Sequence, residues 1–353
     1  MKMRTTAELD LAACSTSRSV FVATAETSRA PALLAIFALA NSTPTSPLTY
    51  AERMLPGVQR KEIRSFDGTP ITYYVRGEGP AVVLANGLGG PLTSYRHVAQ
   101  QLGNDYRILS WDYRGLYDSG RPSDPMALGM DHQIRDLELL LEAEGIDEAV
   151  FLGWSMGVQV AFEFYRRHPE QVAGLVMLCG VAGSPFRTLR GVPAANTILP
   201  SLMSLGKRNA KLVQLVARRV GKWRGLVPLM QRAGVVAPSL DLDIFRKIAE
   251  DFASLDVEMY CETLKQLGEH DCYSSLPDID VPTLLITGDK DLMTPSVAAQ
   301  RMHREIPESR LVVIAGGTHY APVEFPERIE SELDLFLQGV AGYEPVRYRQ
   351  GLS

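Results

Sequence analysis

The sequence predicts an α/β fold, a mostly parallel sheet flanked by helices with an inserted helical cap. Three observations lead to this prediction. Short apolar runs alternate with helical patterns from residue 58 onward, which is typical of a parallel sheet covered on both faces. A G-x-S-x-G stretch, residues 153–157, lies between an apolar run and a helical pattern. Residues 184–280 then separate two groups of apolar runs, and that stretch is too long for a simple connection.

The expected elements follow one another in a regular order. Residues 59–76 alternate between apolar and polar side chains around an Asp67-Gly68 turn signal, which predicts a hairpin. Later apolar runs predict strands, and helical spacing predicts the helices between them. The expected strands are 81–85, 107–111, 149–152, 174–179, 283–287 and 311–315, and the expected helices are 95–102, 131–144, 158–165 and 327–338.

These elements suggest a division of the chain. The 353 residues suffice for one large α/β domain with an insertion. We expect residues 58–183 and 281–342 to form the core and residues 184–280 to form a helical cap, or lid. Residues 1–57 are expected to be an N-terminal arm or helix that can be mobile, and residues 343–353 a C-terminal tail.

The chemistry of the chain is indicated by Gly153-Trp154-Ser155-Met156-Gly157. A serine on a tight turn from strand to helix projects its hydroxyl into a site, and the helix N-terminus offers backbone N–H groups to a developing oxyanion. The flanking glycines allow the neighbouring backbone to approach closely. The alternative interpretation is a glycine-rich turn whose serine has no chemical role.

A serine nucleophile needs a base, and the base needs an orienting carboxylate. Of the six histidines, only His319 follows a strand-like run directly through a glycine turn. Two carboxylates, Asp289 and Asp291, follow the expected strand 283–287. We favour Asp291, because the turn needs a few residues to bring the side chain round to the histidine. Either aspartate can instead serve as a helix cap or turn residue.

The order Ser155, Asp291, His319 is the order of the triad in the α/β-hydrolase fold. The chain resembles the serine esterase-like members of that superfamily that carry a helical cap. Two further stretches support the resemblance: residues 86–90 are placed like the family's oxyanion loop, and residues 112–115, Asp-Tyr-Arg-Gly, are similar to its D-x-R-G motif. A serine at the elbow argues against the relatives that form an alkyl–enzyme ester on an aspartate.

The resemblance extends from about Ile71 to Leu337, with three departures. Asn86 stands where the oxyanion loop usually has histidine. Val158 replaces a second glycine after the elbow. Tyr117 replaces a glycine two residues after the Arg-Gly turn, and its large side chain either lines the mouth of the pocket or packs on the surface.

The resemblance implies a carboxylesterase-like serine hydrolase of the EC 3.1.1 class, acting through an acyl-enzyme. Ser155 attacks the carbonyl, His319 moves the proton and Asp291 orients the imidazole, while backbone N–H groups of Leu88 and Met156 form the oxyanion hole. The expected substrate is an ester, or a thioester or lactone, of a small-to-medium apolar acyl compound. No metal and no organic cofactor is implied.

The cap is expected to cover Ser155 and to set substrate size, although its apolar residues can instead form its own core. Alternatives to hydrolysis are acyl transfer to a nucleophile other than water, C–C bond hydrolysis on the same triad, and a non-catalytic ligand receptor. The candidate pocket residues are Asn86, Trp154, Tyr117, Met203 and Met230, with Leu202, Leu226 and Phe252 as further candidate wall positions.

The cap is strongly divided in charge. Residues 187–240 hold ten lysines or arginines and no acid, whereas acids predominate in residues 241–280. Residues 211–224 have an amphipathic pattern. One interpretation is contact with an anionic partner, such as a phosphorylated acyl carrier or a membrane lipid surface. The sequence favours the alternative, in which the two halves neutralise each other.

Composition limits the partners and the compartment. The net charge of −5 gives no general case for nucleic acid. The four cysteines show no metal-ligand spacing, and reduced thiols fit a cytoplasmic protein. Residues 30–40 imitate an export signal, but acids at Glu8, Asp10 and Glu26 precede them. The cytoplasm is therefore expected, with export as the alternative; the oligomeric state is not indicated.

Overall fold

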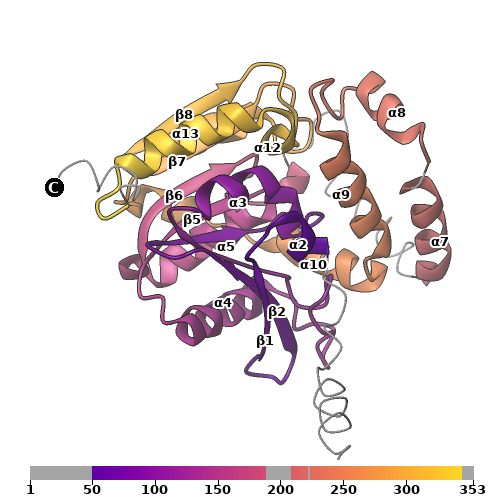
Figure 1. Ribbon diagram of the computed structural model, residues 1–353, viewed down its shortest axis with the longest axis horizontal. Coiled ribbons are helices and arrows are strands. Elements are labelled where there is room, and N and C mark those ends of the chain that lie inside the picture. The colour runs from indigo at the N-terminus through magenta and orange to yellow at the C-terminus, as the bar shows by residue number, and fades with distance from the viewer. Residues whose placement is uncertain (1–49, 188–207, 222, 344–353) are drawn as a thin grey trace, which may run out of the picture. The chain divides into compact units, whose positions relative to one another are not determined.

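Eight strands pair into one sheet within the residues that the computed structural model describes, 50–187, 208–221 and 223–343 (Figure 1). The strand order is β1-β2-β4-β3-β5-β6-β7-β8. The strands are β1 Gln59–Arg64, β2 Pro70–Arg76, β3 Ala81–Ala85, β4 Arg107–Trp111, β5 Ala149–Trp154, β6 Val172–Leu178, β7 Thr283–Gly288 and β8 Ser309–Ile314. The predicted fold class is confirmed.

The first two strands form the expected hairpin. They pair antiparallel with Arg64 opposite Pro70, and the turn between them contains Gly68 at a φ of +82°. The Asp67 side chain closes this turn by accepting a hydrogen bond from the Thr69 N–H at 3.0 Å. Strand β2 also pairs antiparallel with β4, whereas every later pairing in the sheet is parallel.

The strand order brings several strand ends together. Strand β3 lies between β4 and β5 although β4 follows it in the chain. Ala85 at the end of β3 is level with Gly153 near the end of β5, and Gly153 is level with Met177 of β6. Because parallel strands end at one edge of a sheet, the loops that follow β3, β5, β7 and β8 meet there.

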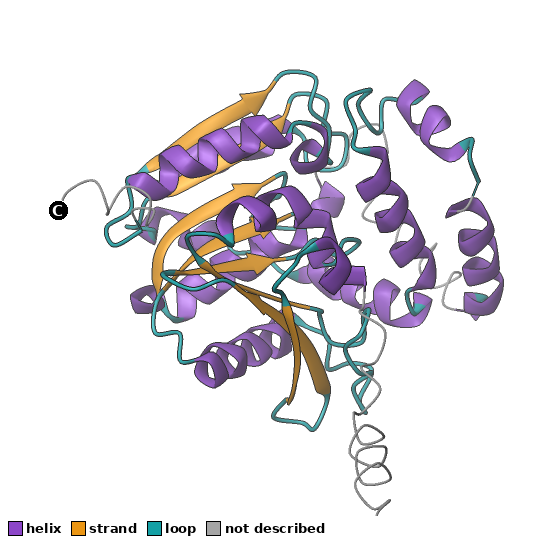
Figure 2. Ribbon diagram, viewed as in Figure 1, coloured by secondary structure: helices purple, strands orange, loops and turns teal. Residues whose placement is uncertain are grey.

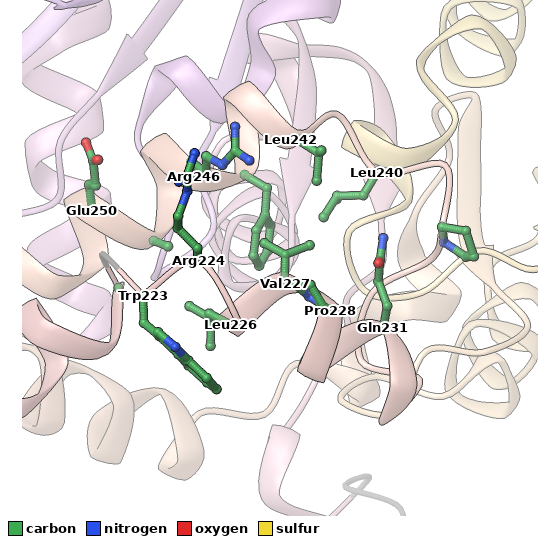
Figure 3. A pocket seen from close by; sticks show the side chains of 14 residues that line it. Trp223, Arg224, Leu226, Val227, Pro228, Gln231, Leu240, Leu242, Arg246 and Glu250 are labelled. Carbon is green, nitrogen blue, oxygen red and sulfur yellow. The ribbon is translucent and has the colours of Figure 1, made fainter.

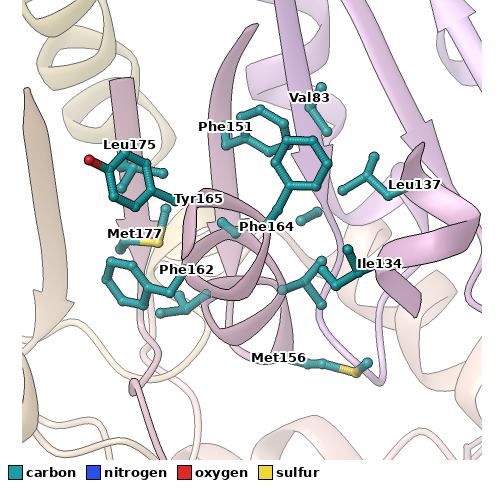
Figure 4. Close-up of a cluster of buried hydrophobic side chains, with 14 of the residues drawn as sticks. Val83, Ile134, Leu137, Phe151, Met156, Phe162, Phe164, Tyr165, Leu175 and Met177 are labelled. Carbon is teal, nitrogen blue, oxygen red and sulfur yellow. The ribbon is translucent and has the colours of Figure 1, made fainter. Parts of the chain in front are cut away.

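Helices cover both faces of the sheet (Figure 2). Buried side chains of α4, α5 and α11 pack on one face, and those of α3 and α13 pack on the other. Under α5 the ring of Phe164 stacks on Phe151 of β5 with ring centroids 4.8 Å apart (Figure 4). These helices are α3 Arg96–Leu102, α4 Met130–Glu144, α5 Met156–Arg167, α11 Ser296–Glu305 and α13 Pro326–Gln338.

The described part of residues 184–280 is helical and contains no strand. Helices α9 and α10 each begin with an aspartate, Asp241 and Asp256, whose side chain accepts two backbone N–H groups of the first turn. The longer helices are α7 Ala210–Gly221, α8 Leu226–Arg232, α9 Leu242–Ser254 and α10 Val257–Glu269. None of the described helices has both the length and the apolar character needed to cross a membrane.

Short helical turns complete the described chain. They lie before the first strand, between strands and helices, and around the loop that follows β8. They are α2 Tyr50–Met54, η1 Leu92–Tyr95, η2 Pro169–Gln171, η3 Pro185–Arg187, η4 Tyr273–Asp278 and α12 Ala321–Glu324.

A buried ion pair joins the loop after β4 to α4 and to the hairpin. Arg114 and Asp136 both have fully buried side chains and are 2.6 Å apart. Arg114 also donates to Asp67 at 2.9 Å, to Ser65 at 3.1 Å and to the carbonyl oxygen of Ala127 at 2.9 Å. The D-x-R-G motif therefore has a structural role at its arginine, because one guanidinium joins three separate segments.

Removing the carboxylate at position 136 is expected to destabilise the fold strongly. Asp136→Asn leaves a buried guanidinium without its main counter-charge, which typically costs about 3–5 kcal/mol. Urea unfolding followed by circular dichroism measures the loss. Asp131→Asn is the control: Asp131 pairs with Arg167 but is 80% exposed, and its loss should cost less than about 1 kcal/mol. Equal losses would contradict this account.

Candidate active site

Ser155 occupies a strained turn between β5 and α5. Its φ is +57° and its ψ is −111°, a backbone conformation that residues other than glycine rarely adopt. The turn is tight because backbones approach closely beside it. A Cβ at Gly157 would lie 1.9 Å from the Ala85 carbonyl oxygen, and one at Gly153 would lie 2.4 Å from the Gly157 carbonyl oxygen. Only glycine fits at these two positions.

Three side chains from separate strand ends form a hydrogen-bonded chain. The Oγ of Ser155 lies 3.0 Å from Nε2 of His319, and Nδ1 of His319 lies 3.0 Å from Oδ2 of Asp291. His319 is 6% exposed and Asp291 is 3% exposed. A neutral imidazole in this arrangement donates from Nδ1 to the carboxylate and accepts the serine proton at Nε2.

The two candidate aspartates lie in different environments. The Oδ1 of Asp291 accepts the N–H groups of Met293 and Thr294, each at 2.8 Å. Asp289 is exposed, and its Oδ1 accepts the Gly316 N–H at 2.7 Å. Asp289 thus fastens the glycine turn after β8, whereas Asp291 contacts the imidazole. The geometry favours the aspartate that the sequence favours.

Thr294 is a site residue that sequence reasoning missed. Its hydroxyl donates to Oδ2 of Asp291 at 2.7 Å, and its oxygen lies 3.2 Å from Nδ1 of His319. Thr294 also lines the pocket described below. A threonine three residues after a candidate acid is a signal that was available, because such a hydroxyl can return to the carboxylate in an Asx-type turn.

The loop that carries His319 is held from two sides. Glu324, 2% exposed, accepts the Thr318 N–H at 2.8 Å and the Thr318 hydroxyl at 2.6 Å. The same carboxylate accepts the Ala237 N–H, from the segment between α8 and α9, at 2.7 Å. On the other side, Nε1 of Trp154 donates to the His319 carbonyl oxygen at 3.0 Å.

Leu88 and Met156 flank Ser155, as the sequence predicts for oxyanion donors. Leu88 belongs to the loop after β3, where a Cβ at Gly87 would lie 3.4 Å from the Ser155 Cβ. Met156 is the first residue of α5. Neither backbone N–H donates a hydrogen bond to another described residue. Both N–H groups therefore have no acceptor among the described residues.

Asn86 and Tyr117, two of the predicted pocket residues, do not line the pocket. The Asn86 amide donates to the Trp111 carbonyl oxygen at 2.7 Å and accepts from the Ser110 hydroxyl at 3.1 Å. Asn86 therefore joins the loop after β3 to strand β4 by two hydrogen bonds. Tyr117 has a φ of +50°, and its hydroxyl reaches the Leu88 carbonyl oxygen at 3.5 Å. Tyr117 therefore packs beside the loop that carries Leu88.

A largely apolar pocket of about 490 Å³ opens above Ser155 and His319. Of the predicted residues, Trp154 and Met230 line it, as do Leu226 and Phe252, whereas Leu202 and Met203 lie outside the described residues. Further lining residues, which the sequence does not predict, come from the loops after β3, β7 and β8, from η3 and from the helices of the insertion. They are Gly87, Gly89, Gly90, Pro185, Phe186, Phe245, Ile248, Ala249, Tyr260, Leu264, Leu267, Met293 and Tyr320.

The pocket carries little charge. The described lining has no lysine, arginine or carboxylate, and its two tyrosines are neutral near neutral pH. Burial raises the pKa of Tyr320 to about 12 and raises that of Tyr260 as well. The pocket therefore suits an uncharged, mainly apolar ligand.

A second hollow, of about 410 Å³, lies within the insertion (Figure 3). Its walls include Trp223, Leu242 and two arginines, Arg224 and Arg246. Three residues, Leu226, Phe245 and Ala249, line both this hollow and the pocket above Ser155. Side chains of α8 and α9 thus separate the two spaces.

Comparison with protein-family models places residues 80–326 in the alpha/beta hydrolase fold family. The chain belongs to this family. The match spans the strands from β3 to β8 and includes the serine, aspartate and histidine described above. The resemblance inferred from the sequence motifs is confirmed, and the family is one of hydrolytic enzymes.

The chain is similar to proteins of several activities. It is 28% identical to the polyketide synthase ThaQ of Burkholderia thailandensis over 83% of its own length, but it spans only 14% of that protein. It is 26% identical to a thermophilic esterase of Thermogutta terrifontis, with 80% of this chain and 98% of that chain covered and a TM-score of 0.59. A bromoperoxidase of Bacillus anthracis shares the fold, at 20% identity, 79% and 100% coverage and a TM-score of 0.66.

Proposed function

We propose that the protein is a serine hydrolase that cleaves a carboxylic ester of a small-to-medium apolar acyl compound. The observation that carries the proposal is the chain of contacts from Ser155 through His319 to Asp291, with 3.0 Å at each step, at one end of an apolar pocket. Similarity to the esterase of Thermogutta terrifontis is consistent with it.

In the proposed reaction the Ser155 Oγ attacks the ester carbonyl carbon while His319 Nε2 takes the serine proton. The carbonyl oxygen becomes an oxyanion that accepts from the backbone N–H groups of Leu88 and Met156, and each such donor contributes about 10²–10³ in rate. His319 then protonates the departing alcohol, and an acyl-enzyme is left. Water, deprotonated by His319, attacks the acyl carbon and releases the acid and Ser155.

Asp291 stabilises the imidazolium that forms in both steps. Its Oδ1 is already saturated by two backbone N–H groups, so the carboxylate cannot turn away from the ring. The hydroxyl of Thr294 donates to Oδ2, the oxygen that faces His319 Nδ1. Thr294 acts as a positioning residue, because it fixes the carboxylate that in turn fixes the tautomer of the imidazole.

The substrate class follows from the lining of the pocket. An apolar acyl group gains from burial against residues such as Phe245, Ile248 and Leu264. A substrate carboxylate or phosphate inside the pocket would meet no cationic side chain other than His319 when protonated, and its desolvation would be uncompensated. Uncharged esters, thioesters and lactones are therefore preferred over charged ones.

Activated esters of increasing acyl length test the proposal directly. The purified chain should hydrolyse short and medium apolar esters, and a fluorophosphonate probe should label Ser155 and no other residue in a peptide map. Ser155→Ala should abolish both signals. Added alcohols in the same assay measure transfer to an acceptor other than water. Persistent labelling of Ser155→Ala would refute the assignment of the nucleophile.

The two aspartates provide a matched pair. Asp291→Asn should lower kcat by orders of magnitude, on the order of 10⁴, because the amide favours the wrong imidazole tautomer. Asp289→Asn should change kcat little, because Asp289 binds the Gly316 N–H and does not contact His319. Steady-state kinetics with thermal unfolding of each variant measure the two effects. The reverse ranking would transfer the role to Asp289.

Phe252 is expected to limit acyl length. Its ring lines the pocket, and a Cβ at Gly89 would lie 3.3 Å from it, so the ring borders the loop beside Ser155. Phe252→Ala should raise kcat/KM for longer acyl groups relative to short ones by roughly tenfold. Leu242→Ala on the same helix is the control, since Leu242 is 41% exposed against 42% for Phe252 and lines only the second hollow. If the dependence of kcat/KM on acyl length is unchanged in Phe252→Ala, then Phe252 does not limit acyl length.

A further inference from the structure

Helix α7 packs against the protein with its least apolar side. The Gln214 side chain donates to the carbonyl oxygen of Leu255 at 3.2 Å. A Cβ at Gly221 would lie 3.1 Å from the Ala249 carbonyl oxygen and 3.4 Å from the Ala253 Cβ. The half-buried positions of the helix are Ala210, Gln214, Ala217 and Gly221. Small and polar residues thus form the side that faces α9.

The apolar side of α7 is exposed on the surface of the described protein. Leu212 is 61% exposed, Leu215 62%, Val216 52% and Val220 42%. Trp223, just beyond the helix, is 55% exposed. A surface helix ordinarily turns such a stripe toward the core. The reversed orientation indicates that these side chains meet an apolar environment outside the described chain.

Cations accompany the exposed apolar stripe. Lys211, Arg218, Arg219 and Arg224 are exposed, and none of the ion pairs between described residues involves them. Several acids of the acidic half of the insertion pair with other cations: Asp251 with Lys247, Glu262 with Lys265, and Asp256 and Glu258 with Arg121. Among the described residues, no ion pair therefore joins these four cations to the acidic half of the insertion.

We propose that the outward face of α7, defined by Leu212, Leu215, Val216 and Val220, binds the surface of an anionic lipid bilayer together with Trp223, which follows the helix. A helix lying in the plane of such a surface buries leucine and valine below the head groups and keeps tryptophan at the interface. Lysine and arginine reach outward to lipid phosphates along their flexible stems. Both parts of this chemistry are present on α7 and in the residues directly after it.

Charge complementarity is the reason for choosing a bilayer. The basic half of the insertion, residues 187–240, has ten cationic residues and no acid, so two copies of this face would repel each other. The second hollow opens close by, with Trp223 and Arg224 in its lining (Figure 3). The inference does not rest on the proposed hydrolysis, because it concerns binding alone.

Vesicle flotation of the full chain tests the proposal. Vesicles of phosphatidylcholine with phosphatidylglycerol should carry the protein at least roughly tenfold better than phosphatidylcholine alone, and raised salt should weaken the binding. Leu212→Ser with Leu215→Ser should lower the partition roughly tenfold. Arg218→Gln with Arg219→Gln should lower it several-fold on anionic vesicles only.

Leu335→Ser is the matched control, because Leu335 on α13 is 62% exposed, like Leu215. This control should float as the unmodified chain does. Hydrolysis of a soluble ester should be unchanged in every one of these variants, so a failure of lipid binding and a failure of the proposed activity are distinguishable. The proposal is overturned if the unmodified chain does not bind anionic vesicles, or if Leu335→Ser loses as much binding as Leu215→Ser. It is also overturned if sedimentation shows a dimer that Leu215→Ser dissociates.

Discussion

The site depends on one close approach of two backbones. Gly157 in the first turn of α5 touches the end of β3 so closely that a methyl group would meet the Ala85 carbonyl oxygen. That contact fixes the helix N-terminus beside the loop after β3 and forces Ser155 to a φ of +57°. Parallel pairing of β3 with β5 through Ala85 and Gly153 holds the strand that leads into the strained turn. Strain of this kind persists only where the surrounding structure dictates it.

Much of this arrangement could be predicted because it follows from chain order at strand ends. Apolar runs identify buried strands, and parallel pairing collects the residues that follow them at one edge. Ser155, Asp291 and His319 each follow such a run, so the structure brings them together. The length of the turn favours Asp291 over Asp289, and it is Asp291 that contacts His319.

Other features depend on contacts that no local pattern specifies. Asn86 and Tyr117 are polar or aromatic residues near the site, but the Asn86 amide donates to the Trp111 carbonyl oxygen and the Tyr117 hydroxyl reaches the Leu88 carbonyl oxygen. The spacing of apolar residues in α7 shows that the helix has two faces, yet periodicity alone cannot say which face packs inward. Packing of α7 on α9 decides that question, and it depends on Gln214 and Gly221.

The carboxylate of Glu324 has a mechanical consequence for access to the pocket. It accepts from Thr318 beside the reacting histidine and from Ala237 in the insertion, so the corner of the insertion near Ala237 is anchored to the histidine loop. Moving the segment at Ala237 away from the histidine loop would leave the Ala237 N–H without an acceptor and the Glu324 carboxylate with one hydrogen bond fewer. Each unsatisfied buried group costs about 1–3 kcal/mol. An opening for substrate entry that leaves this anchor in place avoids that cost, so the anchor favours movement in the parts of the insertion away from Ala237.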